Sequence, residues 1–140
     1  MSDFDPEEWL TVAELCCRSE FGEAYLRTAV NRAYYAALLS TKHRIEQTVG
    51  VGSVPRVQTH ATILNAVRTG GREFEPIHNA LRKLKQEREA VDYEVRNAPL
   101  QRWRVRSQVR LSRDVIRNHI KALPDAAFRT LMLSLPHRSA

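Results

Sequence analysis

The feature that most restricts the fold is a long stretch, from about residue 21 to residue 48, whose apolar residues cover most of a helical circumference. One side of that helix would carry Tyr25, Ala29, Ala36 and Leu39, and the other Val30, Tyr34, Ala37, Leu38 and Ile45. A helix that is apolar on more than one face is covered by neighbours on more than one face. Gly50 and Gly52 end the pattern. We therefore expect a central helix with other helices packed around it.

Helical patterns also occur before and after this segment. The first begins at Asp5-Pro6, where an N-cap residue precedes a proline, and extends to about residue 18. Others span about residues 57–68, from 76 to the turn at 96–99, and 102–123, followed by a short amphipathic tail at 125–135. Two of them carry narrow apolar stripes, formed by Ile77, Leu81, Leu84 and Val91 and by Val105, Val109, Ile116 and Ile120. No strand pattern competes, so the predicted class is all-α, an antiparallel bundle of four to five helices.

Length and composition fit one domain. With 140 residues and 43% hydrophobic content, the chain can bury a single core, expected over about residues 6–123, with the tail at 125–135 packed on it. No apolar run is long enough to cross a bilayer, and the acidic N-terminus does not resemble a secretory signal, so we expect a cytoplasmic protein. Cys16 and Cys17 are adjacent and point about 100° apart on a helix, which does not suit an ordinary disulfide. Without further cysteines at zinc-ligand spacing, neither a metal nor a cofactor is expected.

The net charge of +6 has an uneven distribution. Between Glu94 and Asp125 the only acid is Asp114, against the following bases: Arg96, Arg102, Arg104, Arg106, Arg110, Arg113, Arg117 and Lys121. Arginine outnumbers lysine there, and its planar guanidinium suits bidentate contacts with phosphate. The segment therefore indicates a nucleic acid or a nucleotide as a partner. The alternative is a solvated helix face that keeps the protein soluble.

Two arginines fall on apolar helix faces. Arg88 continues the stripe of the fourth helix four residues after Leu84, and Arg32 lies three residues after Ala29 on the central helix. Moving a guanidinium out of water costs several kcal/mol unless it is paired, so each needs a carboxylate, a carbonyl or an anionic ligand. Asp92, four residues after Arg88, supplies a purely structural alternative in which the arginines are internal struts.

These residues belong to an ordered set of motifs. Arg27 precedes Arg32-Ala33-Tyr34-Tyr35-Ala36-Ala37, which is followed by a helix start at Thr59-His60 and then by Arg88 with Asp92-Tyr93. The set covers about residues 25–120 and resembles small stand-alone HEPN proteins. Their second helix carries an Arg-Ala-Tyr-Tyr-Ala motif, and their fourth ends in Arg-x-x-Ala-Asp-Tyr. The resemblance directs attention to the second, third and fourth helices.

The resemblance implies a homodimer in which two copies of the arginine motif share a cleft. Many members of the superfamily are metal-independent ribonucleases, often toxins paired with a nucleotidyltransferase antitoxin. Their motif is an arginine followed, after four to six residues, by a histidine. This sequence offers Arg88 and then Tyr93 at the position of the histidine, with Asp92 beside it. Because tyrosine, with a pKa near 10, is a poor general base at neutral pH, binding without catalysis is the alternative to cleavage.

A histidine and several arginines complete the candidate site. His60 begins the third helix, where it could contact a phosphate or cap the helix. Arg113 and His119 also match the arginine-to-histidine spacing, but six residues on a continuous helix turn by about 240°, so their side chains would diverge. The predicted catalytic residues are Arg88, Tyr93 and Asp92, and the predicted RNA- or nucleotide-binding residues are Arg32, Tyr35, His60, Arg96, Arg102 and Arg104. The functions considered are a ribonuclease, a non-catalytic RNA- or nucleotide-binding subunit that partners a nucleotidyltransferase, and a purely structural helical dimer.

Overall fold

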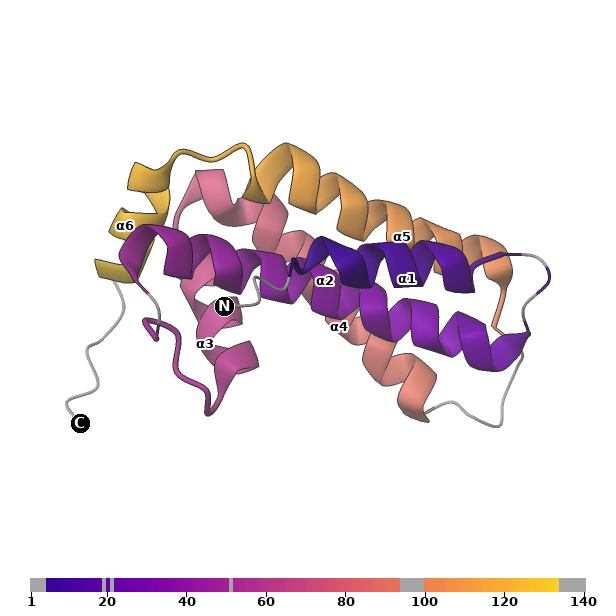
Figure 1. Ribbon diagram of the computed structural model, residues 1–140. Helices are drawn as coiled ribbons and strands as arrows, with labels where there is room; N and C mark the ends of the chain where they lie inside the picture. Colours follow the sequence, from indigo (N-terminus) through magenta and orange to yellow (C-terminus); the bar gives the residue numbers. More distant parts are fainter. Residues whose placement is uncertain (1–4, 19, 21, 51, 94–99, 134–140) are drawn as a thin grey trace.

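The protein is all-helical wherever its structure is described. The computed structural model describes residues 5–18, 20, 22–50, 52–93 and 100–133. Its elements are α1 (Glu7–Cys16), α2 (Glu23–Val49), α3 (Thr59–Thr69), the 3-10 turn η1 (Arg72–Phe74), α4 (Glu75–Tyr93), α5 (Arg102–Val115), the π-helical turn η2 (Ile116–Ile120) and α6 (Asp125–Leu133). Figure 1 shows α1, α2, α4 and α5 lying lengthwise beside one another, with α3 and α6 near the end of α2. The predicted all-α class is confirmed, and none of the described helices has the length and apolar content of a membrane span.

The longest helix, α2, lies at the centre of the molecule. It packs against α1, α3, α4, α5, η2 and α6. Residues on both of its predicted apolar sides are buried, namely Ala29, Ala36, Val30, Tyr34, Ala37, Leu38 and Ile45. Tyr25 is an exception, because its side chain is 49% exposed while the adjacent Leu26 takes the buried position in this turn. The central role predicted for this helix is confirmed.

Local signals explain where the first two helices begin and end. The carboxylate of Asp5 accepts a hydrogen bond from the backbone N–H of Glu7 at 2.9 Å, which is the capping role expected for this residue. At the C-terminal end of α2, Gly50 adopts a φ of +130°, a conformation that glycine reaches without steric strain. Cys16 and Cys17 at the end of α1 are buried free thiols, and burial raises the pKa of both.

The apolar stripes of α4 and α5 face the core as predicted. All of their members are buried: Ile77, Leu81, Leu84, Val91, Val105, Val109, Ile116 and Ile120. A polar contact also joins α5 to α2, because the buried hydroxyl of Ser112 donates a hydrogen bond to the carbonyl of Ala33 at 2.7 Å. The packing of both stripes against α2 fixes the faces of α4 and α5 that remain outside the core.

The continuous fifth helix predicted over residues 102–123 is interrupted. Its α-helical part ends at Val115, and η2 follows with a wider hydrogen-bond spacing. The backbone N–H of Lys121 donates to the carbonyl of Ile116 at 3.0 Å, five residues back instead of four. The wider turn keeps both Ile116 and Ile120 in the core while the chain turns toward Pro124 and α6.

The last helix, α6, packs against α2 and α3. Phe128 is fully buried and meets Phe74 edge to face, with ring centroids 5.3 Å apart. A second contact to the Phe128 ring comes from Arg44 of α2, whose guanidinium carbon lies 4.8 Å from the ring centroid. The same guanidinium donates a hydrogen bond to the carbonyl of Leu123 at 2.6 Å. The side chains of residues 132–135, at the end of the predicted tail, lie outside the described part of the chain.

Candidate functional site

Arg88 of α4 lies against two tyrosines of α2. Its Nη1 donates a hydrogen bond to the hydroxyl of Tyr35 at 2.9 Å. Its guanidinium carbon is 5.2 Å from the ring centroid of Tyr34 and 5.4 Å from that of Tyr35, within the range of cation–π attraction. The side chain is half-buried on the core stripe of α4 where the periodicity placed it. The guanidinium of Arg88 thus contacts two aromatic rings and one hydroxyl.

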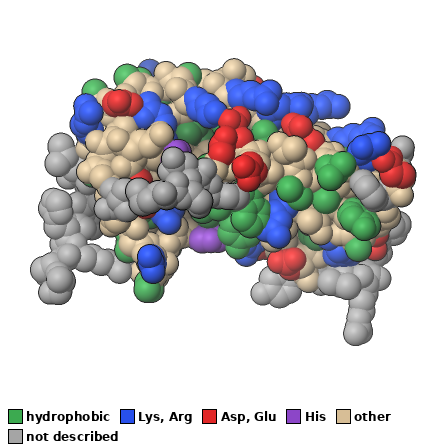
Figure 2. All heavy atoms as spheres, viewed as in Figure 1, with side chains coloured by type: hydrophobic (Ala, Val, Ile, Leu, Met, Phe, Trp, Pro, Cys, Tyr) green, Lys and Arg blue, Asp and Glu red, His purple; other side chains and the backbone are tan. Residues whose placement is uncertain are grey.

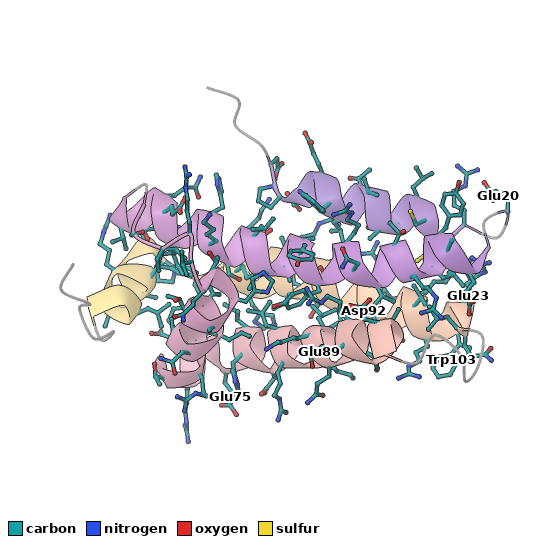
Figure 3. The ribbon with its side chains drawn as sticks, turned by 90° about the horizontal axis from the view of Figure 1, so that it is seen from below. Glu20, Glu23, Glu75, Glu89, Asp92 and Trp103 are labelled. Atoms are coloured by element: carbon teal, nitrogen blue, oxygen red, sulfur yellow. The ribbon has the colours of Figure 1, made fainter. Side chains whose placement is uncertain are left out.

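No carboxylate neutralises Arg88 within the described part of the chain. Asp92 is exposed one turn further along α4, where Figure 3 labels it, and the two side chains form no ion pair. The Nε atom of Arg88 is buried and has no hydrogen-bond partner among the described residues. The internal strut suggested by the Arg88 to Asp92 spacing is therefore not formed, and one guanidinium N–H has unused hydrogen-bonding capacity.

His60 joins the same group of side chains from the first turn of α3. This turn begins after Gln58, whose φ is +60°, and Thr59 secures it by donating its hydroxyl to the carbonyl of Pro55 at 2.7 Å. The Nδ1 atom of His60 lies 3.0 Å from the hydroxyl of Tyr34 in a hydrogen bond. The His60 ring also meets the Tyr35 ring edge to face at 5.4 Å. A histidine that begins a neighbouring helix is therefore brought to the tyrosines beside Arg88.

The electrostatics of this group favour a neutral histidine and a protonated tyrosine. Burial, followed by the positive charges of Arg88 and Lys85, lowers the pKa of His60 below its ordinary value of 6.5. Burial raises the pKa of Tyr34 to about 12, although Arg88 acts in the opposite direction. At neutral pH, His60 is therefore uncharged and can exchange a proton, whereas Tyr34 keeps its proton.

A second arginine extends the group toward α1. The guanidinium carbon of the half-buried Arg32 lies 3.9 Å from the ring centroid of Trp9. The Trp9 ring is in turn 6.1 Å from that of Tyr35. We call the set formed by Trp9, Arg32, Tyr34, Tyr35, His60 and Arg88 the arginine–aromatic cluster. Sequence reasoning missed Trp9 and Tyr34 as members. The signal that could have pointed to Trp9 is that it is the one tryptophan of the first helix.

The other predicted site residues have different positions. Arg102 donates to the carbonyls of Cys17 and Arg18 at 3.0 and 2.8 Å, at the C-terminal end of α1. Arg104 forms an ion pair of 2.8 Å with Glu87 of α4. Tyr93 is the last residue of α4, but its side chain, like the whole of Arg96, lies outside the described part. The structure therefore unites Arg32, Tyr35, His60 and Arg88 and gives Arg102 and Arg104 contacts of their own.

Arg113 and His119, the second arginine-to-histidine match, are separated by the start of η2. Arg113 forms an ion pair of 3.1 Å with Glu14 of α1. His119 is half-buried, and no hydrogen bond or ring contact joins it to Arg113 in the described structure. The interruption of the helix therefore does not create a second site from this pair.

The arrangement of the cluster suits an anion and a proton transfer. Arg88 contributes a half-buried guanidinium that no described carboxylate pairs with, and His60 contributes an imidazole that is neutral at pH 7. No group of three His, Cys, Asp or Glu side chains suited to a metal ion occurs among the residues described. No protein-family model, curated protein or solved structure gives a significant match to this chain. Its function is therefore argued from the residues themselves.

Proposed function

We propose that this protein is an RNA-directed effector of the HEPN type that recognises phosphate through Arg88. The observation that carries the proposal is an arginine on the core stripe of α4 with two tyrosine rings and one hydroxyl around it, but with no carboxylate among the described residues. A partly desolvated guanidinium that lacks a carboxylate gains from pairing with an anion. A phosphate of RNA or of a nucleotide is such an anion.

The catalytic form of the proposal is a metal-independent endoribonuclease. Neutral His60 would accept the proton of a ribose 2′-hydroxyl, and the 2′-oxygen would then form a bond to the adjacent phosphorus. The bond to the 5′-oxygen breaks, a water molecule gives a proton to that oxygen, and the hydroxide so formed takes the proton back from His60. Arg88 would stabilise the charge that develops on the phosphate oxygens. In this scheme His60 performs the role for which Tyr93 is poorly suited.

The proposal includes the assembly that the resemblance implies. The helices would form a HEPN-like antiparallel bundle, and two copies would pair so that both Arg88 side chains face one cleft. A nucleotidyltransferase antitoxin would be the partner protein if the chain acts as a cytoplasmic toxin. The half-buried position of Arg88, Arg32 and His60 supports a location where a second surface could approach them.

Binding without cleavage is the second candidate function. The observation in its favour is that His60 is the one histidine that contacts the cluster in the described structure. Cleavage is fastest when both a base and an acid are supplied, and Tyr34 is a poor acid because its pKa is raised to about 12. In this form the protein is an RNA- or nucleotide-binding subunit.

Incubation of purified protein with total RNA in the presence of a chelator tests the catalytic form. Wild type should produce fragments ending in 2′,3′-cyclic phosphate, and both Arg88→Met and His60→Gln should abolish them. Arg82→Met is the matched control, because Arg82 is exposed on the same helix and its loss removes the same charge. Cleavage that survives Arg88→Met contradicts the proposed role of Arg88.

The binding form is tested with a fluorescently labelled RNA. Affinity should fall as salt rises, because counterions are released from the phosphates on binding. Arg88→Met should weaken the complex while Arg82→Met changes it little. Equal affinity for wild type and Arg88→Met, together with no cleavage, would leave only the structural role for this arginine.

A further inference from the structure

Two adjoining hollows lie along α5, on a different side of the molecule from α3. The first, of about 200 Å³, is between the end of α1 and α5, and the second, of about 340 Å³, continues along α5. Both are lined by Arg110 and Arg113, so they adjoin each other at these two residues. We call the two hollows together the α5 groove. Figure 1 shows α5 on the upper edge of the molecule and α3, which carries His60, on the lower side.

The lining of the α5 groove is strongly basic. The arginines are Arg18, Arg106, Arg110, Arg113 and Arg117, whereas the acids are Glu14 and Asp114. Figure 2 shows Lys and Arg side chains gathered along the upper edge, over α5. Because these charges are close together and partly exposed, the groove attracts a polyanion.

The structure separates the arginines that are already engaged from those that are not. Arg18 pairs with Glu20 at 2.7 Å, Arg113 with Glu14 at 3.1 Å, and Arg117 approaches Glu7 at 3.8 Å. Arg106 and Arg110 are exposed and form no ion pair or hydrogen bond with any described residue. They lie four residues apart, which is about 6 Å along a helix. Two adjacent guanidinium groups are thus open to successive anionic groups.

An exposed aromatic residue, Trp103, lies on the same outer face of α5 as Arg110. Trp103 is 69% exposed and lies seven residues, or about two helical turns, before Arg110. Residues at that spacing share one helix face. Figure 3 labels Trp103 at the end of the molecule where Glu20 and Glu23 also lie. An indole this exposed offers a flat face on which a nucleobase can stack.

We infer that the α5 groove binds single-stranded RNA, with its phosphates on Arg106 and Arg110 and a base stacked on Trp103. Arginine alone would also suit an acidic protein, but a flat, exposed indole in line with open guanidinium groups favours a nucleic acid with unpaired bases. That the nucleic acid is RNA rests on the proposed function. The groove itself uses none of the residues of the arginine–aromatic cluster.

The experiment measures the affinity of wild type and variants for a labelled single-stranded RNA across a salt series. Each lost phosphate contact lowers the slope of log K against log salt by about 0.7 for a single strand. Arg106→Gln/Arg110→Gln should therefore lower it by about 1.4. Arg72→Gln/Arg82→Gln is the control, because it removes the same charge from exposed positions on η1 and α4 and should leave the slope unchanged. Arg106→Lys/Arg110→Lys, which keeps the charge, should restore the slope.

Trp103→Ala tests the stacking contact. It should weaken binding of single-stranded RNA by about 5- to 150-fold and remove most of the tryptophan quenching that RNA causes. A duplex of the same sequence should bind wild type more weakly, since its bases are not open to the indole. Circular dichroism confirms that each variant remains helical.

Three results would overturn the inference. The first is an equal loss of slope in the Arg72→Gln/Arg82→Gln control, which would show an effect of net charge alone. The second is equal binding of duplex and single strand with no effect of Trp103→Ala. The third is competition by an acidic polypeptide as strong as that by RNA, with unchanged Trp103 fluorescence, which would identify an acidic protein as the partner. Arg88→Met is measured alongside, because only the proposed function of the arginine–aromatic cluster depends on Arg88. Its result shows whether that proposed function fails, independently of whether the α5 groove binds RNA.

Discussion

Replacement of Arg88 by methionine removes one of the two guanidinium groups of the arginine–aromatic cluster, leaves Arg32 in place, and keeps an unbranched side chain at position 88. The interactions that stabilise Arg88 are modest. The hydrogen bond from its guanidinium to Tyr35 at 2.9 Å is worth about 1.5 to 3 kcal/mol, as is typical for a charged donor. The two ring contacts, at 5.2 and 5.4 Å, add about 0.5 to 1 kcal/mol each.

Opposing costs of similar size act on the same side chain. Its buried Nε, without a partner in the described structure, costs about 1 to 3 kcal/mol. Desolvation of the half-buried guanidinium adds to that cost, although less than for a fully buried ion. The terms nearly cancel, so we expect the free energy of unfolding of Arg88→Met to lie within about 2 kcal/mol of wild type. At about 4 °C per kcal/mol for a chain of this size, Tm should change by less than about 8 °C.

Chemical denaturation followed by circular dichroism gives the stability, and anisotropy with labelled RNA gives the affinity of the same samples. We expect nearly unchanged stability and a clear loss of binding or cleavage. A loss of more than about 4 kcal/mol, as for a buried network broken by removal of one partner, combined with RNA binding equal to that of wild type, would refute the reasoning. Arg82→Met should match wild type in both measurements, since Arg82 is exposed.

Three further predictions concern the cluster and the packing of α6. Because the pKa of His60 is lowered in the folded state, the unfolded chain binds its proton more readily. The free energy of unfolding should then fall as pH drops from about 6.5 toward the folded pKa, by at most about 1.4 kcal/mol per pH unit, and His60→Gln should remove this component from denaturation curves measured across pH. Phe128→Ala should lower the free energy of unfolding by about 3 to 5 kcal/mol in urea titrations, because the ring is fully buried against Phe74; a loss under about 1 kcal/mol would contradict the docking of α6. Gly70→Ala would place a Cβ against Leu131 Cδ1 and 2.8 Å from Phe74 Cδ2, so it should cost about 1 to 3 kcal/mol, measured as a lowered Tm, and an unchanged Tm would show that this contact adjusts freely.

Periodicity predicted the parts of the structure that depend on one helix at a time. The stripes of the fourth and fifth helices, the central position of the second and the core-facing position of Arg88 all follow from where residues fall on a helical circumference. The capping role of Asp5 is equally local. These features need no knowledge of how far one helix is shifted along another.

The contacts between helices could not be predicted in this way. Periodicity gives the face on which Arg32 or Tyr34 lies, but the offset of α1 and α3 along α2 decides that Arg32 meets Trp9 and that Tyr34 meets His60. The same limit applies to the arginines of the fifth helix. Arginines recur along that helix with a single acid, Asp114, among them. Even so, Arg104 pairs with Glu87 of α4, whereas Arg106 has no ion-pair partner among the residues described.

The π-helical turn at Ile116–Ile120 links the length of the fifth helix to the seating of the sixth. Deleting one residue there would let ordinary four-residue hydrogen bonding resume, and everything downstream would rotate by about 100° and retreat by about 1.5 Å. Phe128 would then point away from the ring of Phe74 that it meets at 5.3 Å. The extra residue of the π-helical turn thus determines the rotational orientation of the C-terminal region. In a chain shortened by one residue at this point, α6 would have to pack in a different way.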